Sequence, residues 1–428
     1  MLIQFSVKNY KCFKEEVKLS LIASNYDKET HWESNVFAMP EFNLQLLKTA
    51  VVYGANASGK SKLLEALSFM KDIIFNSSKE SQVNEPIPLE VFKFSSETEH
   101  EPSVFEIIFI HQNQLFRYGF EATKQNIVAE WLYHRPKTKE IEIFYRDKTA
   151  FEVHRNFKDI ANLVKNKMVR DNALLLSVAA QFNNRLAKDV FNWFDSLFIF
   201  IDKDYNKYFK YTMSKILDDA EYLNIMDLLK KADIGIDSIK FLKKQGNKDT
   251  KESLTTIAFH KKYNERREHI GDDYLILDTE ESFGTVKYFM IIGFLLDALK
   301  LGKICIIDEL DAELHSNLVV SIINLFHNKT INKHNAQLIF NTHNTNLLSA
   351  NLFRRDQIFF TEKDRYGAAS MYSLTDFVTE DGSKARKQED FETNYIRGKY
   401  GAIPYLANFE QLTSFENPLK TAKMSICG

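Results

Sequence analysis

The sequence predicts an α/β fold: a mixed sheet with an antiparallel β subdomain and a helical insertion beside it. Three observations support this. An apolar, β-branched run at 46–53 (LLKTAVVY) leads into a glycine-containing loop, and apolar residues at helical spacing follow from Ser61. Short β-rich runs separated by turns fill 89 to about 156. Helical periodicity then fills about 157 to 235. These patterns predict strands and helices in alternation, with one all-β stretch.

The composition is that of an ordinary globular chain. Its 428 residues can form two or three domains, and 44% apolar with 13% aromatic residues is ample for a core. A net charge of −2 gives no overall attraction to nucleic acid, so such binding would need a local patch. Three cysteines, Cys12, Cys305 and Cys427, have no metal-ligand spacing. No apolar run reaches the roughly 18 residues of a membrane span. We therefore expect a cytoplasmic protein with no membrane partner.

The remaining elements follow in order along the chain. Residues 1–25 predict strands in a hairpin, and 76–88 predict a loop. Strands return over 237–277 around a polar turn, and a long helix follows Ser282. Buried strands are expected at 303–307 (KICII) and 337–341 (QLIFN). This divides the chain into 1–156, with the first loop and the β subdomain; 157–236, the helical insertion; and 237–428, the second half of the main domain.

The loop at 54–61 is the strongest motif. It reads GANASGKS, which fits glycine, four residues, glycine, lysine, then serine or threonine. A strand before it and a helix after it favour a phosphate-binding loop over a glycine-rich turn without a ligand. Backbone N–H groups would face phosphates, Lys60 would add a positive charge and Ser61 would offer a hydroxyl to Mg²⁺. The expected nucleotide-binding residues here are Gly54, Asn56, Ala57, Ser58, Gly59, Lys60 and Ser61.

The buried strand at 304–307 ends in two carboxylates, Asp308 and Glu309. In nucleotide hydrolases the first such carboxylate holds Mg²⁺, and the second polarises the attacking water as a general base. A solvated strand end is the alternative, and the phosphate-binding loop in the same chain argues against it. We therefore expect Ser61 and Asp308 at the metal and Glu309 as a catalytic residue.

A histidine follows the next buried strand. The sequence at 341–343 is Asn-Thr-His, so His343 comes just past a core strand. Placed beside the other strand ends, it could hydrogen-bond a γ-phosphate. The alternative is a histidine in a surface loop.

The start of the long helix at 281–287 reads ESFGTVK. Serine and glycine at a helix start form an anion-binding N-terminus. By itself this pattern is weak, because most such strings are plain helix caps. Its position shortly before the strand that leads to Asp308 strengthens the case for an anion-binding site.

Together these motifs resemble an ABC-type ATPase head of the branch that contains structural-maintenance-of-chromosomes (SMC), Rad50 and RecF proteins. Within that branch the chain is most similar to the AAA15 (RloA-like) ATPases. The supporting segments are FSVKNYKCF, YGANASGKS, ESFGT, IIDELDAELH and FNTHNTNLL, with RRDQIFFTEKD and YIRGKYGAIPYL near the C-terminus. A glutamine that such heads hold near the metal is unassigned; Gln82 is the nearest candidate.

The resemblance implies an ATPase that forms ADP and phosphate, with ATP and Mg²⁺ as ligands. It implies a homodimer, or a higher oligomer, with ATP sandwiched between subunits. Ser282, Gly284 and Thr285 would act in trans on the γ-phosphate held by the partner's loop, and 311–315 would cross the interface. Proteins of this kind are often the ATPase half of bacterial anti-phage, toxin–antitoxin-like systems. There they scaffold or gate a separate effector such as a nuclease. The alternative is a RecF- or Rad50-like DNA-repair ATPase acting directly on DNA.

Two further segments each allow two interpretations. Residues 240–267 carry nine Lys or Arg against three acidic residues, a local charge of +6. This run is either a contact for DNA or an acidic partner, such as a phage protein, or a solvated hairpin. The tail at 397–404 (RGKYGAIP) is either a partner-docking strand or a turn that closes the sheet, and the second is favoured.

Overall fold

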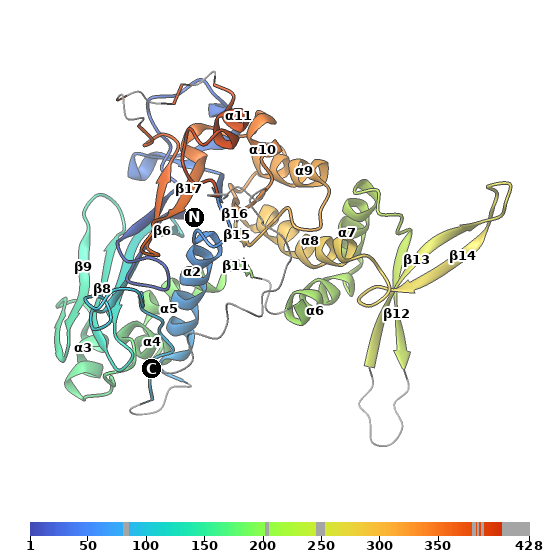
Figure 1. The fold of residues 1–428 in the computed structure, drawn as a ribbon. Helices are drawn as coiled ribbons and strands as arrows, with labels where there is room; N and C mark the ends of the chain where they lie inside the picture. Colours follow the sequence, from blue (N-terminus) through green and yellow to red (C-terminus); the bar gives the residue numbers. More distant parts are fainter. Residues whose placement is uncertain are drawn as a thin grey trace, which may run out of the picture.

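The computed structural model describes residues 1–79, 85–201, 205–244, 253–378, 382, 385–386 and 389–404. At its centre is a six-stranded sheet (Figure 1) with strand order β11-β15-β16-β5-β17-β18. All neighbouring strands pair in parallel except β17 and β18, which are antiparallel. The strands are β11 (Leu197–Phe200), β15 (Ile304–Ile307), β16 (Gln337–Asn341), β5 (Thr49–Gly54), β17 (Ile358–Lys363) and β18 (Ala369–Ser373).

A seven-stranded antiparallel sheet lies beside this central sheet, with strand order β10-β9-β8-β7-β6-β1-β2. Its strands are β10 (Ala150–Val153), β9 (Ile141–Asp147), β8 (Ile127–Arg135), β7 (Gln114–Ala122), β6 (Ser103–His111), β1 (Leu2–Lys8) and β2 (Val17–Ser20). A short pair, β3 (Val36–Met39) and β4 (Leu44–Leu47), follows β2, with α1 (Trp32–Asn35) and the 3-10 turn η1 (Pro40–Phe42) around it.

The central sheet separates two hydrophobic cores. On β5, Ala50 and Val52 face the first core, whereas Val51 and Tyr53 face the second. Both faces of β5 are buried, which explains why its sequence is almost continuously apolar. The first core contains the seven-stranded sheet with α2 (Lys60–Asn76), α3 (Lys158–Lys165), α4 (Leu175–Gln181) and α5 (Arg185–Asp195). The second contains α6 (Tyr205–Ile216), α7 (Asp219–Lys231), α8 (Phe283–Leu301), α9 (Ser316–His327), α10 (Asn346–Ser349) and α11 (Phe391–Ile396). The 3-10 turn η2 (Arg355–Gln357) precedes β17.

A third sheet projects away from the two cores (Figure 1). It consists of β12 (Ser238–Lys244), β13 (Ser253–Tyr263) and β14 (His269–Ile276), all antiparallel. Residue Ser282, at the start of α8, follows β14 after a short turn. The projecting sheet is therefore directly connected to the helix that the sequence singled out.

The predicted α/β fold, with its mixed sheet and antiparallel β subdomain, is confirmed. The structure differs from the sequence analysis in three local places. The run at 46–53, expected as one strand, is divided between β4 (Leu44–Leu47) and β5 (Thr49–Gly54), which belong to different sheets. Residues 197–200 fall in the range predicted to be helical, but they form β11, which pairs with β15. Residues 91–94 (VFKF), expected as a strand, lie outside the strands. Short apolar runs by themselves do not decide between strand, helix and irregular structure, so pairing with other strands decides which of them join a sheet.

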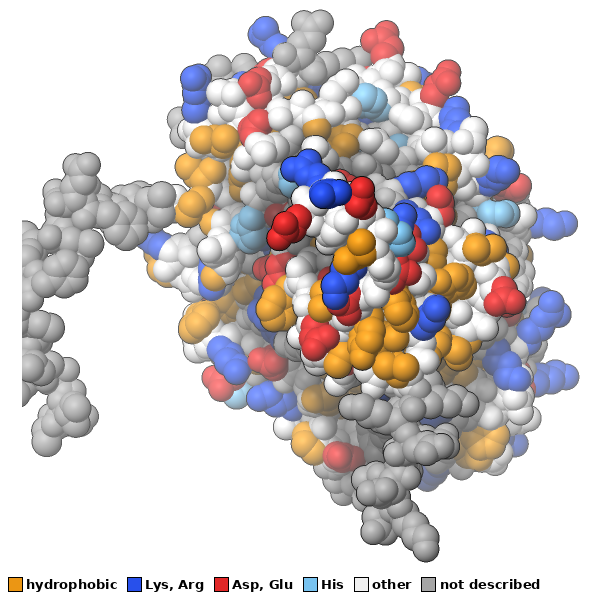
Figure 2. Space-filling view, turned by 90° about the vertical axis from the view of Figure 1, so that its right-hand side faces the viewer, with side chains coloured by type: hydrophobic (Ala, Val, Ile, Leu, Met, Phe, Trp, Pro, Cys, Tyr) orange, Lys and Arg blue, Asp and Glu red, His pale blue; other side chains and the backbone are white. Residues whose placement is uncertain are grey.

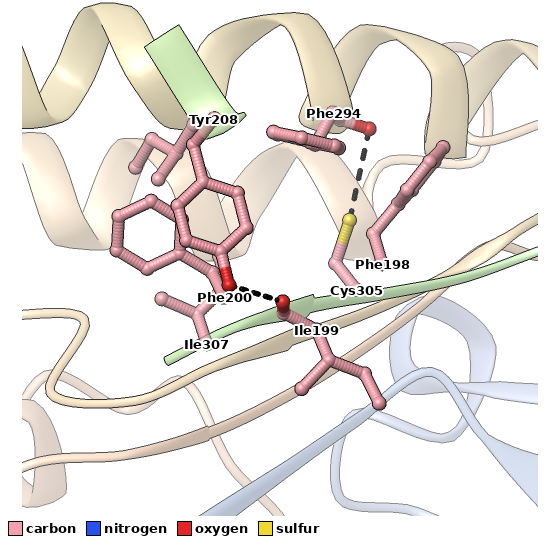
Figure 3. Close-up of a pocket in the computed structure, with 8 residues that line it drawn as sticks. Phe198, Ile199, Phe200, Tyr208, Phe294, Cys305 and Ile307 are labelled. Carbon is pink, nitrogen blue, oxygen red and sulfur yellow. Dashed lines mark hydrogen bonds between the residues drawn. The ribbon is translucent and has the colours of Figure 1, made fainter. Parts of the chain in front are cut away.

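The described helices include none that is long and apolar enough to cross a membrane. One small apolar pocket lies between α6, α8 and the strands β11 and β15 (Figure 3). Its volume is about 10 Å³, and Phe198, Phe200, Tyr208, Phe294 and Cys305 are among its lining residues. A pocket of this size is barely large enough for one water molecule, so we regard it as a packing gap behind β15.

Candidate nucleotide-binding site

The backbone of the loop between β5 and α2 depends on glycine at two positions. Gly54 and Gly59 have φ angles of 157° and 114°, which side chains rarely adopt. A Cβ atom added at Gly54 would lie 2.4 Å from the backbone oxygen of Thr361. The Ser58 hydroxyl contacts the Thr361 hydroxyl at 2.7 Å. The loop is therefore held against β17, while Asn56 and Ala57 are exposed to solvent.

Lys60 is the buried cation of this loop. Only 5% of its surface is exposed, and its Nζ donates to the backbone oxygens of Gly54 and Ala55 at 2.8 and 2.9 Å. Burial lowers the pKa of Lys60 to about 8, while Glu309 and Asp308 oppose that shift. The ammonium group thus lies in the electrostatic field of the two carboxylates.

Asp308 and Glu309 follow directly after β15, at the carboxyl end of the parallel sheet. The backbone N–H of Asp308 donates to the oxygen of Phe200 at the end of β11 (2.8 Å). Carboxyl ends of parallel strands meet at the same edge, which is also where β5 enters its loop. The structure thus places the predicted carboxylates and the predicted phosphate-binding loop on one edge of the central sheet.

Asn341, at the end of β16, is a site residue that the sequence analysis did not assign. Its side-chain oxygen accepts from the backbone N–H of Glu309 at 2.5 Å, and its amide group donates to the carboxylate of Asp308. It is fully buried. Glu309 has a left-handed φ of 47°, so its backbone needs such support. The available signal was the position of Asn341 at the end of a core strand.

His343 lies close to these groups and is exposed to solvent. Its backbone N–H donates to the carboxylate of Asp311 at 3.3 Å. Partial burial and then the Lys60 charge lower the pKa of the His343 imidazole, while Asp311, Glu309 and Asp308 oppose the shift. These influences indicate that the strand-end histidine shares the field of Lys60 and the carboxylates, and they favour its neutral form.

The start of α8 is a well-formed helix cap in this chain. The Ser282 hydroxyl accepts from the backbone N–H of Thr285 at 3.1 Å and contacts its hydroxyl at 2.9 Å. A Cβ atom added at Gly284 would lie 2.4 Å from the backbone oxygen of Glu313. Among the described residues, no hydrogen bond joins Ser282 or Thr285 to the chain's own phosphate-binding loop.

The tail packs against β17 and β18 of the central sheet, which supports a structural role over a partner-docking strand. Tyr400 is fully buried and stacks on Phe360 at 5.7 Å, and its backbone oxygen accepts from the hydroxyl of Tyr372 at 2.6 Å. The helix before the tail, α11, approaches the site, because the ring of its Tyr395 lies 5.7 Å from that of Tyr53 in β5. This helix thus supports the strand that leads into the phosphate-binding loop.

The basic run at 240–267 is partly neutralised in the fold. Lys262 pairs with Asp273 at 2.9 Å, and Lys261 lies 3.7 Å from Asp237. Figure 2 faces this end of the molecule, and acidic, basic and hydrophobic side chains are interspersed over it. The described residues on this face therefore form no single strongly positive area. The side chains of Lys243 and Lys244, and residues Lys248, Lys251 and Gln82, lie outside the described residues.

Comparisons with known proteins identify one family and several similar solved structures. A family model described as "AAA domain, putative AbiEii toxin, Type IV TA system" matches residues 50–349. No curated protein matches the chain. Among solved structures, the chain is similar to the SMC head domain from Thermotoga maritima at 12% identity. That match covers 87% of this chain and 98% of the other, with a TM-score of 0.38.

Proposed function

From the premise that this chain belongs to the family described as "AAA domain, putative AbiEii toxin, Type IV TA system", we propose that it binds and hydrolyses ATP. One observation carries this proposal: Lys60, Asp308, Glu309 and His343 share one edge of the central sheet, where both carboxylates oppose the lowering of the pKa of Lys60 and of His343. A cation in a glycine loop beside two carboxylates is the arrangement that phosphoryl-transfer sites use.

The site also fits Mg²⁺. This cation prefers oxygen ligands and keeps several waters, so one hydroxyl and one carboxylate are sufficient protein ligands when phosphates supply the rest. Ser61 in the first turn of α2 and Asp308 at the end of β15 would be those ligands. Among the described residues no cluster of three or more His, Cys, Asp or Glu could hold a metal by itself. When bound, Mg²⁺ neutralises phosphate charge as the terminal phosphate leaves.

The protein's part in the reaction follows from these positions. Glu309 accepts a proton from the attacking water, whose oxygen bonds to the γ-phosphorus while the bond to the β-phosphate oxygen breaks. The products are ADP and phosphate. Lys60 leaves its two backbone carbonyls and binds the β- and γ-phosphates, and neutral His343 hydrogen-bonds the γ-phosphate. Asn341 holds the backbone of Glu309 in place.

We further propose that two chains sandwich two ATP molecules, as in ABC-type heads. Ser282, Gly284 and Thr285 of one chain would bind the γ-phosphate on the loop of the other. Support comes from the form of this helix start, which is capped, glycine-containing and beside an exposed Phe283 (79% exposed). An exposed aromatic residue at such a place is suited to a protein contact.

In the cell we propose that the ATP-driven assembly is a sensor and scaffold that controls a separate effector, such as a nuclease, in bacterial anti-phage defence. The family description, with its toxin–antitoxin wording, supports this assignment. The second candidate is a DNA-repair ATPase that acts directly on DNA. The role is tested by expressing the chain with its neighbouring genes and challenging the cells with phage. Protection that requires both Glu309 and a co-purifying partner supports the role; tight DNA binding by the isolated chain without a partner contradicts it.

A further inference from the structure

Lys287 is a buried lysine whose charge the proposed reaction does not use directly. It lies in the second turn of α8, five residues after Ser282, and only 3% of its surface is exposed. Its Nζ donates to the backbone oxygen of Glu309 at 2.6 Å and to that of Ala312 at 3.0 Å. Burying an ammonium group costs free energy, so a buried lysine on these two carbonyls is a candidate for a functional role.

The two carbonyls belong to the loop that follows β15. Glu309 itself has a left-handed φ of 47°, and its N–H is held by Asn341. Lys287 therefore holds the peptide on the other side of the same residue. With one hydrogen bond on each side, the backbone of Glu309 is fixed between β16 and α8 in a conformation that a free loop would rarely adopt.

A second contact ties the same two segments together. Gly284 is so close to Glu313 that an added Cβ atom would lie 2.4 Å from its backbone oxygen. The first turns of α8 and the loop 309–313 thus touch through a backbone contact and through Lys287. A displacement of the helix start must then displace the loop, because close-packed segments move together.

We propose that Lys287 is a positioning residue for Glu309, and that it couples the helix start of α8 to the catalytic carboxylate of the same chain. This inference rests on the proposed function. In the ATP sandwich the helix start of one chain contacts the nucleotide held by the partner, whereas Glu309 acts on the nucleotide of its own chain. Lys287 then links the two ATP sites, so that engagement of one nucleotide aligns the general base at the other.

The test uses the full chain and three variants. Lys287→Met keeps the side-chain length but removes both donated hydrogen bonds, and Lys287→Arg keeps donors at the same place. The matched control is Lys300→Met, in the last turn of the same helix, where the side chain is 58% exposed and pairs with Glu221. Steady-state hydrolysis, its Hill coefficient and ATP-dependent molar mass are measured for each, the last in a Glu309→Gln background.

We expect Lys287→Met to lower kcat about 100-fold, as a misplacement of about 1 Å can do. The KM should stay within about threefold, because ATP contacts are intact. For Lys287→Met, the Hill coefficient should fall to about 1 and ATP-dependent assembly should persist. Lys287→Arg should recover most of kcat, and Lys300→Met should behave as wild type. Unchanged hydrolysis by Lys287→Met, or loss of ATP binding in parallel with kcat, would overturn the inference.

Two precautions keep the outcomes distinct. If the methionine variant does not fold, Lys287→Gln is measured in its place, with the same expected and contradicting results. If the wild-type chain itself does not hydrolyse ATP, the proposed function fails, whatever Lys287 does. If wild type hydrolyses ATP and Lys287→Met matches it, only the coupling inference fails.

Discussion

The side-chain oxygen of Asn341 accepts a hydrogen bond of 2.5 Å from the backbone N–H of Glu309. The amide group of the same side chain also contacts the carboxylate of Asp308. One buried asparagine at the end of β16 therefore orients both acidic residues at the end of β15. The geometry of the candidate site depends on this neighbouring strand as much as on the strand that carries the carboxylates.

Replacement of Asn341 by alanine should slow hydrolysis strongly. The change leaves the Glu309 N–H and one Asp308 oxygen without their partner, so we expect kcat to fall about 100-fold and stability to fall by about 1–3 kcal/mol. Asn332→Ala is the matched control, because Asn332 is also buried and binds backbone groups, away from the site. It should lower the melting temperature similarly without changing kcat. Equal kcat values in the two variants would contradict a role of Asn341 in the site.

The sequence predicted the parts of this site that lie within one continuous segment. The loop at 54–61 and the Asp308–Glu309 pair follow from local spacing, because a strand and its adjacent loop are neighbours in the chain. Asn341 and Lys287 were not predicted as partners of Glu309, because they lie 32 and 22 residues away from it along the chain. Strand β11 was missed for the same reason, since its pairing with β15 spans a long stretch of chain.

ATP affinity should weaken at alkaline pH because of Lys60. Its pKa is lowered to about 8 in the free protein, first by burial, and bound phosphates would raise it again. Below pH 8 the lysine is already charged. Above pH 8 binding must take up a proton, so affinity should fall by up to about tenfold per pH unit. Calorimetry in buffers of different ionisation enthalpy measures this uptake, and equal affinity with no proton uptake at pH 7.5 and 9 would contradict it.

His343→Ala should lower kcat about 100-fold with little change in ATP binding, since it removes one hydrogen bond to the reacting phosphate. Burial and the Lys60 charge lower the pKa of His343, so the imidazole stays neutral from alkaline pH down to below its usual value near 6.5. His334→Ala, an exposed histidine outside the site, is the control. A variant as fast as wild type would exclude the assigned role.

Gly284→Ala should separate ATP binding from assembly. The added Cβ would press against the backbone oxygen of Glu313 at 2.4 Å and displace the start of α8. ATP binding to the chain's own loop should persist, whereas ATP-dependent association should be lost. Gly293→Ala lies in the same helix, and its Cβ would meet Thr212 at 2.6 Å. That variant should be less stable but still associate; if both variants associate normally, α8 does not form the interface.

The most direct measurement is the molar mass in solution of wild type and Glu309→Gln, each with and without Mg·ATP. Because loss of the general base should slow hydrolysis by about 10²–10⁴, the variant should retain bound ATP. We predict a stable, ATP-dependent increase in mass for Glu309→Gln and at most a transient increase for wild type. A mass that is the same in all four samples, together with unchanged turnover in the variant, would contradict both the ATP-sandwiched assembly and the assignment of Glu309 as the base.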